Sequence, residues 1–125
     1  MVARVQNNGL ARITSLLSAA NWYLQWGTSS GAAASANVVT TTSTSEARTL
    51  AVAAQGTTTV TNDKMVLTGT ITAAGTRAIT EVGAFDAAGS GSPPTGGNMD
   101  IYGDFSVINL AVGDSIAFTV NTTFS

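Results

Sequence analysis

The second half of the chain alternates apolar and polar residues with period two, and turn residues interrupt this alternation at short intervals. Successive side chains of a β-strand point to opposite faces of its sheet, so this pattern is typical of strands with one buried face. No helical pattern separates the runs, which excludes a parallel α/β architecture. The predicted strands cover residues 64–72, 78–86, 99–105 and 115–124.

The first half of the chain is less regular but also favours extended structure. An aromatic segment at residues 22–26 places Trp22 and Trp26 on one face of a strand, and residues 46–54 are compatible with another. The β-branched run of residues 57–61 should also be extended. Within 78–86, Ile79 and Phe85 are expected on one face, opposite Val82 and Ala84.

Two stretches lack the pattern of a strand. Residues 28–45 are a low-complexity run of small residues, which we interpret as a long loop or an edge segment. Residues 87–97 are rich in Gly and Pro and are expected to form an exposed loop. About seven short strands separated by turns indicate an all-β protein, a single β-sandwich of jelly-roll or immunoglobulin-like topology.

The N-terminal residues differ from the rest. Residues 1–9 are polar and contain the turn signal Asn7-Asn8-Gly9, so they are expected to form an arm. From Leu10 to Ala20 the apolar residues recur at helical spacing, which predicts a short amphipathic helix. We therefore divide the chain into residues 1–20, the arm and helix, and residues 21–125, the sandwich.

Composition narrows the chemistry that the chain can perform. It has no histidine and no cysteine, which removes the commonest general base, the commonest zinc ligands and any disulfide. Charged residues make up 10% of the chain, against about 25% in typical soluble domains. The few cations are scattered, so nucleic-acid binding is not expected. No apolar run is long enough to span a membrane and no signal-peptide pattern is present, so we expect a protein made and kept soluble.

Catalytic groups are equally scarce. A serine nucleophile would need Lys64, the single lysine, which sits at a predicted turn. Asp100 and Asp104 share a strand face but are four residues apart, roughly 13 Å, which is too far for a glycosidase pair. Asp86, Asp100 and the carbonyls of loop 87–97 offer oxygen ligands for calcium, but without any known spacing. We predict no enzyme, no cofactor and no metal site.

A surface for binding other proteins is the remaining possibility. A charge-poor exterior of Ala, Thr, Ser and Gly suits extended contact with neighbours, although an uncharged monomer is the alternative. Trp22 and Trp26 are expected to fill the core, which leaves Tyr23 on the opposite face as a contact residue. Arg4 and Arg12 are the charged residues of the N-terminal region. We therefore predict Arg4, Arg12 and Tyr23 as protein-interface residues.

Several segments resemble a family of small bacteriophage structural proteins, over most of residues 21–125. The most distinctive are Thr-Glu-x-Gly-x-Phe-Asp-Ala at residues 80–87 and Gly-Asp-Ser-Ile-x-Phe at residues 113–118. Loop 87–98, with Pro93-Pro94, is longer than the family pattern, so no loop contacts are transferred. The other matching residues are 21–28, 45–48, 61–72, 77–79, 108–112, 119 and 124–125.

The resemblance implies a virion component, and within that group a capsid cement or decoration protein on the outside of the phage head. Its partner would be the phage major capsid protein, bound across neighbouring subunits, and the chain would form a homo-oligomer, a dimer or trimer. It would be made in the host cytoplasm. The alternative is a tail or baseplate appendage that binds a host receptor through Tyr23 and loop 87–97. A third hypothesis, a carbohydrate-active enzyme, is disfavoured by the carboxylate spacing and the missing histidine.

Overall fold

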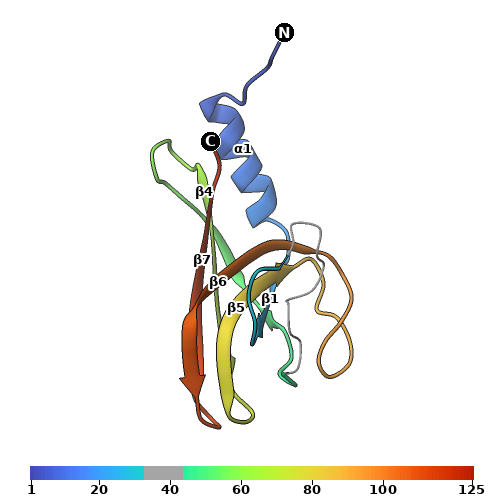
Figure 1. The fold of residues 1–125 in the computed structure, drawn as a ribbon. Helices are drawn as coiled ribbons and strands as arrows, with labels where there is room; N and C mark the ends of the chain where they lie inside the picture. Colours follow the sequence, from blue (N-terminus) through green and yellow to red (C-terminus); the bar gives the residue numbers. More distant parts are fainter. Residues whose placement is uncertain (33–43) are drawn as a thin grey trace.

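Two antiparallel sheets packed together and one N-terminal helix make up the structure (Figure 1). The computed structural model describes residues 1–32 and 44–125. Strand order is β2-β1-β5-β6 in the four-stranded sheet and β3-β4-β7 in the three-stranded sheet. The predicted mostly-β, sandwich-like architecture is confirmed. The elements are α1 (Asn7–Ser18), β1 (Tyr23–Gly27), β2 (Thr49–Leu50), β3 (Val52–Gly56), β4 (Lys64–Thr72), β5 (Arg77–Phe85), β6 (Met99–Leu110) and β7 (Ser115–Thr123).

The core lies between the sheets and is built from alternate strand positions. β4 has the predicted bounds and buries Met65, Leu67 and Ile71. Trp26 of β1 meets Phe118 of β7 edge to face, with ring centroids 6.4 Å apart. This aromatic pair joins the two sheets across the core.

The chain crosses from one sheet to the other at Ala51, within the segment predicted as a single strand over residues 46–54. That prediction is wrong: β2 belongs to the four-stranded sheet and β3 to the three-stranded sheet. The buried Ala51 donates its N–H to the carbonyl of Trp22 at 2.8 Å. Because β2 has two residues, alternation in the sequence cannot reveal the crossing.

Residues 57–61 are not a strand, although every side chain in the run is β-branched. They bend around Asp63, whose carboxylate accepts backbone N–H groups from Thr58, Thr59 and Val60 at 2.7–3.0 Å. A carboxylate that binds several consecutive N–H groups outweighs the weaker β-propensity of threonine and valine.

The pairing of β5 with β6 shifts register between Ile79 and Glu81. Ile79, Val82 and Ala84 all belong to the core, whereas Phe85 is buried outside it. The prediction that Ile79 and Phe85 share a face is therefore wrong. An irregularity of this kind breaks strict period two, so the sequence pattern alone assigns the faces incorrectly.

Helix α1 begins at Asn7, so the predicted turn at Asn7-Asn8-Gly9 is wrong, and it ends at Ser18 rather than Ala20. Val5 packs against the first turn: a Cβ at Gly9 would lie 2.8 Å from the Val5 Cγ1. Gly9 thus allows the close contact that sets the direction in which the arm of residues 1–6 leaves the helix.

The helix docks on the end of the three-stranded sheet, against β3 and β4 (Figure 1). Its buried residues are Leu10 and Thr14, while Leu16 is 63% exposed. The Thr14 hydroxyl donates to the Asn62 carbonyl at 2.6 Å and accepts from the Gln55 side chain at 2.8 Å. Polar contacts to the sheet therefore fix the helix, and they select a face that the apolar pattern alone does not predict.

The loops complete the fold. Of the predicted loop or edge segment 28–45, residues 28–32 and 44–45 contain no strand, and residues 33–43 lie outside the described residues. Loop 87–97 is largely exposed, as predicted, but contains an isolated bridge between Ser90 and Thr95. Pro94 is buried, so the loop rests on the body of the protein.

Candidate functional site

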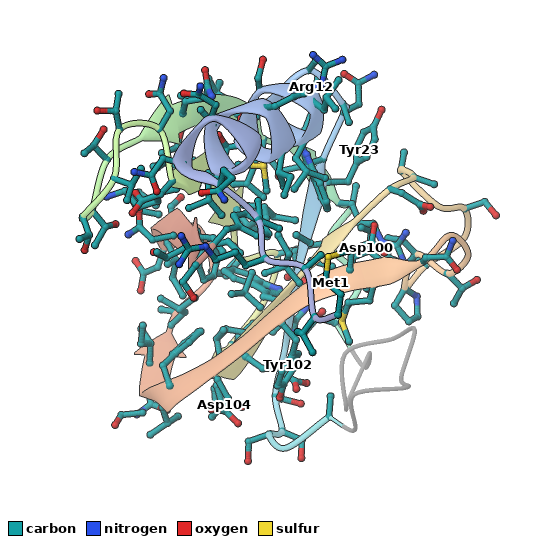
Figure 2. All side chains as sticks on the ribbon, turned by 90° about the horizontal axis from the view of Figure 1, so that it is seen from above. Met1, Arg12, Tyr23, Asp100, Tyr102 and Asp104 are labelled. Carbon is teal, nitrogen blue, oxygen red and sulfur yellow. The ribbon has the colours of Figure 1, made fainter. Side chains whose placement is uncertain are left out.

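The three predicted interface residues lie on three different elements. Arg4 is exposed in the arm. Arg12 is exposed on α1, and Tyr23 is half-buried at the start of β1 (Figure 2). Trp22 and Trp26 are buried in the core, as predicted. Within residues 1–32 and 44–125, no hydrogen bond or ion pair joins Arg4, Arg12 and Tyr23, so they do not form one built site.

Most acidic side chains are used to hold the chain's own segments. Six of the seven accept a hydrogen bond from another part of the chain, and Asp100 is the exception among the described residues. The acceptors and one donor to each are Glu46 (Ala74 N–H), Asp63 (Thr58 N–H), Glu81 (Tyr102 hydroxyl), Asp86 (Asn98 N–H), Asp104 (Gly31 N–H) and Asp114 (Ala111 N–H).

Glu46 joins segments that are distant in the sequence. Its carboxylate accepts from the Arg77 Nε at 3.0 Å, the Ala74 N–H at 2.9 Å and the Trp26 Nε1 at 3.3 Å. Burial opposes ionisation, but the backbone hydrogen bonds, the Trp26 donor and the Arg77 charge together hold the pKa of Glu46 below its ordinary value. This ionised carboxylate ties residues 44–48 to the β4–β5 turn.

Two carboxylates face each other across the paired strands β5 and β6, and the sequence pattern does not reveal this pair. Glu81 of β5 lies directly opposite Asp104 of β6, where side chains are about 5 Å apart at Cβ. Figure 2 shows Asp100, Tyr102 and Asp104 in succession along β6. Tyr102 donates its hydroxyl to Glu81 at 2.7 Å, and Asp104 accepts the Gly31 N–H at 3.2 Å.

This carboxylate pair holds the segment that follows β1. Glu81 has no exposed surface, so a substrate cannot reach its carboxyl group in this conformation. The hydroxyl of the neighbouring Thr80 donates to the Ser29 carbonyl. Together with the bond from Gly31 to Asp104, these contacts fasten residues 28–32 to the four-stranded sheet. The register shift between β5 and β6 determines which acids face each other, and it cannot be read from the sequence.

Arg48 is the centre of a buried polar network that sequence reasoning missed. Its guanidinium lies over the Phe85 ring, 3.7 Å from the centroid. Its Nε donates to the Gln25 side chain at 2.9 Å, and its Nη1 donates to the carbonyls of Ala87 and Gly96 at 2.9 and 2.8 Å. Burial lowers the pKa of Arg48 and the charge of Asp86 raises it, with a net decrease from its ordinary value.

The network fixes both ends of loop 87–97. Gln25, itself buried, donates to the Pro94 carbonyl at 3.2 Å. Gly89 has a positive φ of 70°, and a Cβ there would lie 2.9 Å from the Arg48 Nη1. The loop therefore rests on a polar base that holds residues near both of its ends. The sequence gives no indication of this because Arg48 looks like any isolated surface cation.

Of the oxygen ligands considered for calcium, Asp86 and the carbonyls of Ala87 and Gly96 already accept hydrogen bonds. The Asp86 carboxylate accepts the backbone N–H of Asn98 at 2.7 Å and its side-chain amide at 3.0 Å. These hydrogen bonds from Asn98 are the main cause of a pKa of Asp86 below its ordinary value. In the described part of the chain, no group of three or more acidic side chains is close enough to hold a metal ion.

An apolar pocket of about 230 Å³ opens beside the C-terminal half of α1. Leu17, Trp22, Ile101, Thr122 and Phe124 line it, with Asp100 among them as the one charged residue. Burial, and to a lesser extent the charge of Asp86, raise the pKa of Asp100 above its ordinary value. The hydroxyl of Thr122 is buried and has no hydrogen-bond partner in the described part of the chain. The pocket thus combines an apolar wall with an unpaired carboxylate.

Apolar side chains are also exposed outside this pocket. They lie in the arm, at the β2–β3 crossing and near the β6–β7 connection. No helix among the described residues is long and apolar enough to cross a membrane. The exposed large apolar residues are Met1, Val2, Val5, Leu16, Leu50, Val52, Val107, Ile108 and Val112.

Comparison with known proteins gives no relative for this chain: no family model, no curated protein and no solved structure matches it.

Proposed function

We propose that the chain is a non-catalytic structural protein of a bacteriophage particle, a capsid cement or decoration protein on the outside of the head. It binds across neighbouring subunits of the major capsid protein and adds contact area that stabilises the shell. The segmental resemblance at residues 80–87 and 113–118 supports the phage assignment. The jelly-roll or immunoglobulin-like topology stays a prediction.

The observation that carries the proposal is how the charges are distributed. The chain has five cations and seven acids among its 125 residues. Six of these twelve charged residues are buried or half-buried: Glu46, Arg48, Asp63, Lys64, Arg77 and Glu81. The exposed surface therefore depends on uncharged and apolar side chains, such as Val52 and Val112, each 70% exposed. Such a surface favours close packing of many copies, because few charges must be desolvated or repel one another.

The arm and α1 provide the bridging element of the proposal. Residues 1–6 have no helix or strand structure, and Arg4 and Arg12 are exposed charges that can reach a neighbouring subunit. An arm that orders on contact adds interface area without enlarging the sandwich.

The alternative is a tail or baseplate appendage that binds a host receptor. The polar base under loop 87–97 favours it, because a loop held near both ends loses little entropy on binding. Loss of receptor or glycan binding on Tyr23→Ala, with Arg12→Ala as the matched control on another element, would support this alternative.

The copy number in purified particles tests the proposal directly. Quantitative mass spectrometry should find the chain within a few-fold of the most abundant shell protein. A number many-fold lower would favour the tail appendage, and absence from particles would refute both. Deletion of residues 1–6 should weaken binding to shells lacking the protein, while leaving the unfolding transition of the sandwich unchanged.

A further inference from the structure

The N-terminal arm and the apolar pocket beside α1 are complementary in chemistry. The arm exposes Met1 and Val2 fully and carries the cation Arg4, which has no hydrogen bond or ion pair within the described residues. The pocket is apolar and contains Asp100, the one acid that has no hydrogen bond or ion pair within residues 1–32 and 44–125. The arm supplies exposed apolar side chains and a cation, and the pocket supplies an apolar wall and a carboxylate.

We propose that the arm of one copy of the chain docks in the pocket of a second copy, with Val2 in the apolar cavity and Arg4 paired with Asp100. The copies thereby form a homo-oligomer. The inference rests on the proposed function, because it names the binding partner of the arm of the proposed cement protein.

The size and spacing of the two surfaces agree. An apolar cavity of about 150 Å³ can hold a benzene-sized molecule, so about 230 Å³ is ample for a valine side chain. In an extended chain, residues two apart point to the same side, roughly 7 Å from each other. Val2 can therefore enter the cavity while Arg4 reaches the carboxylate beside it.

Two further features favour an opposite charge at Asp100. Burial and the Asp86 carboxylate make its ionised form less favourable, and an incoming guanidinium would relieve both effects. The pocket wall supplies no cation of its own. A cation from another molecule therefore stabilises ionised Asp100 more than it would stabilise a carboxylate that already accepts hydrogen bonds.

The direction of the arm explains why a second copy is the occupant. Val5 rests on Gly9 in the first turn of α1, whereas Leu17, which lines the pocket, lies roughly 12 Å further along the helix axis. Figure 1 shows the arm leading away from the sandwich beyond this contact. Reciprocal docking of two arms would give a twofold dimer, and docking in one rotational sense would close a ring such as a trimer.

Cysteine cross-linking of the full chain provides the test, because the natural sequence contains no cysteine. The single variants Val2→Cys and Thr122→Cys, mixed and oxidised, should form a mixed disulfide dimer. The matched control pairs Val2→Cys with Leu50→Cys, an exposed apolar position outside the pocket. Equal yields from the two pairs would overturn the proposal.

Charge reversal gives an independent readout. By sedimentation velocity, Arg4→Glu and Asp100→Arg should each weaken self-association by about tenfold or more, and the double variant should recover it. Arg4 is in the exposed arm, so its substitution does not threaten folding. A wild-type monomer at all concentrations, or failure of the double variant to recover association, would overturn the proposal.

The double variant Val2→Cys/Thr122→Cys separates the two possible sources of the arm. A rapid disulfide within a monomer at high dilution would show that the pocket takes its own arm, and would overturn the intermolecular contact. All of these measurements use the free protein. Their failure therefore leaves the copy number in particles, and with it the proposed function, to be decided separately.

Discussion

Replacing Arg48 with methionine should release loop 87–97 and destabilise the whole protein. Methionine keeps much of the length and apolar volume of the side chain but removes three charge-assisted hydrogen bonds, to Gln25, Ala87 and Gly96. It also removes the guanidinium from the face of Phe85. The substitution therefore isolates the polar network from simple loss of packing.

The expected magnitude follows from these contacts. Hydrogen bonds from a charged donor contribute about 1.5–3 kcal/mol each, and the cation–π contact contributes about 0.5–2 kcal/mol. Removing a buried charge also recovers several kcal/mol of desolvation free energy, which offsets much of that sum. We expect a net loss of about 3 kcal/mol in the free energy of unfolding, or roughly 10 °C in Tm for a domain of this size.

Hydrogen exchange should show where the loss occurs. The amides of Asp86, Ser90 and Thr95, which bond to carbonyls within or beside the loop, should exchange much faster in Arg48→Met. Arg12→Met is the matched control, because Arg12 is exposed on α1 and has no hydrogen bond or ion pair within residues 1–32 and 44–125, so the free energy of unfolding should change by less than about 0.5 kcal/mol. The reasoning is refuted if the two variants lose equal stability, or if the loop amides exchange at the wild-type rate in Arg48→Met.

Three further substitutions test the other structural roles. Asp63→Asn should lower the free energy of unfolding at neutral pH, and the variant should lose less of its stability in acid than the wild type. The N–H groups that Asp63 binds lower its pKa in the folded state. Its contribution to stability is therefore present above the ordinary carboxyl value of 3.8 and disappears as the pH falls through the folded pKa. Urea unfolding between pH 2 and 7 measures this. Thr14→Val should cost about 1–2 kcal/mol, because it removes the donor to the Asn62 carbonyl and one of the two acceptors of the Gln55 amide, and denaturant unfolding should detect it. Leu67→Ala should cost about 2–5 kcal/mol, whereas Leu16→Ala should change unfolding by less than about 0.5 kcal/mol; equal losses would contradict the assigned helix face.

Period two in the sequence predicts the long strands because their pattern is local. β4 and β7 carry alternation over nine residues each, so the sequence predicts the bounds of β4, those of β7 to within one residue, and the buried faces of both. In β6 the alternation covers the predicted residues 99–105, whereas the strand continues to Leu110. The crossing at Ala51 depends on which distant strand each short segment pairs with, and two residues of β2 contain no periodicity. The face of Phe85 depends on a register shift between two strands, which is a property of the pair rather than of either sequence.

Polar side chains explain the remaining differences. Asp63 captures the backbone of residues 58–60, so a run with strand propensity bends instead. Thr14, a residue of middling helix propensity, fixes the buried face of α1 through a hydrogen bond to Asn62. Predicting such effects requires knowing which donor meets which acceptor, and residue type alone does not contain that information.

The partners of the few ionised side chains also connect the fold to the candidate binding surfaces. A charge-poor chain gains most from its few ionised groups when they organise the loops that the small core leaves uncovered. Glu46 and Arg48 do this for residues 44–48 and for loop 87–97, and Asp104 does it for residues 28–32. Arg4 and Asp100 do not take part, and they lie at the exposed arm and at the apolar pocket. An ionised group without an internal role, next to uncovered apolar surface, is what an intermolecular contact requires, because there both the charge and the apolar area gain a partner at the same time.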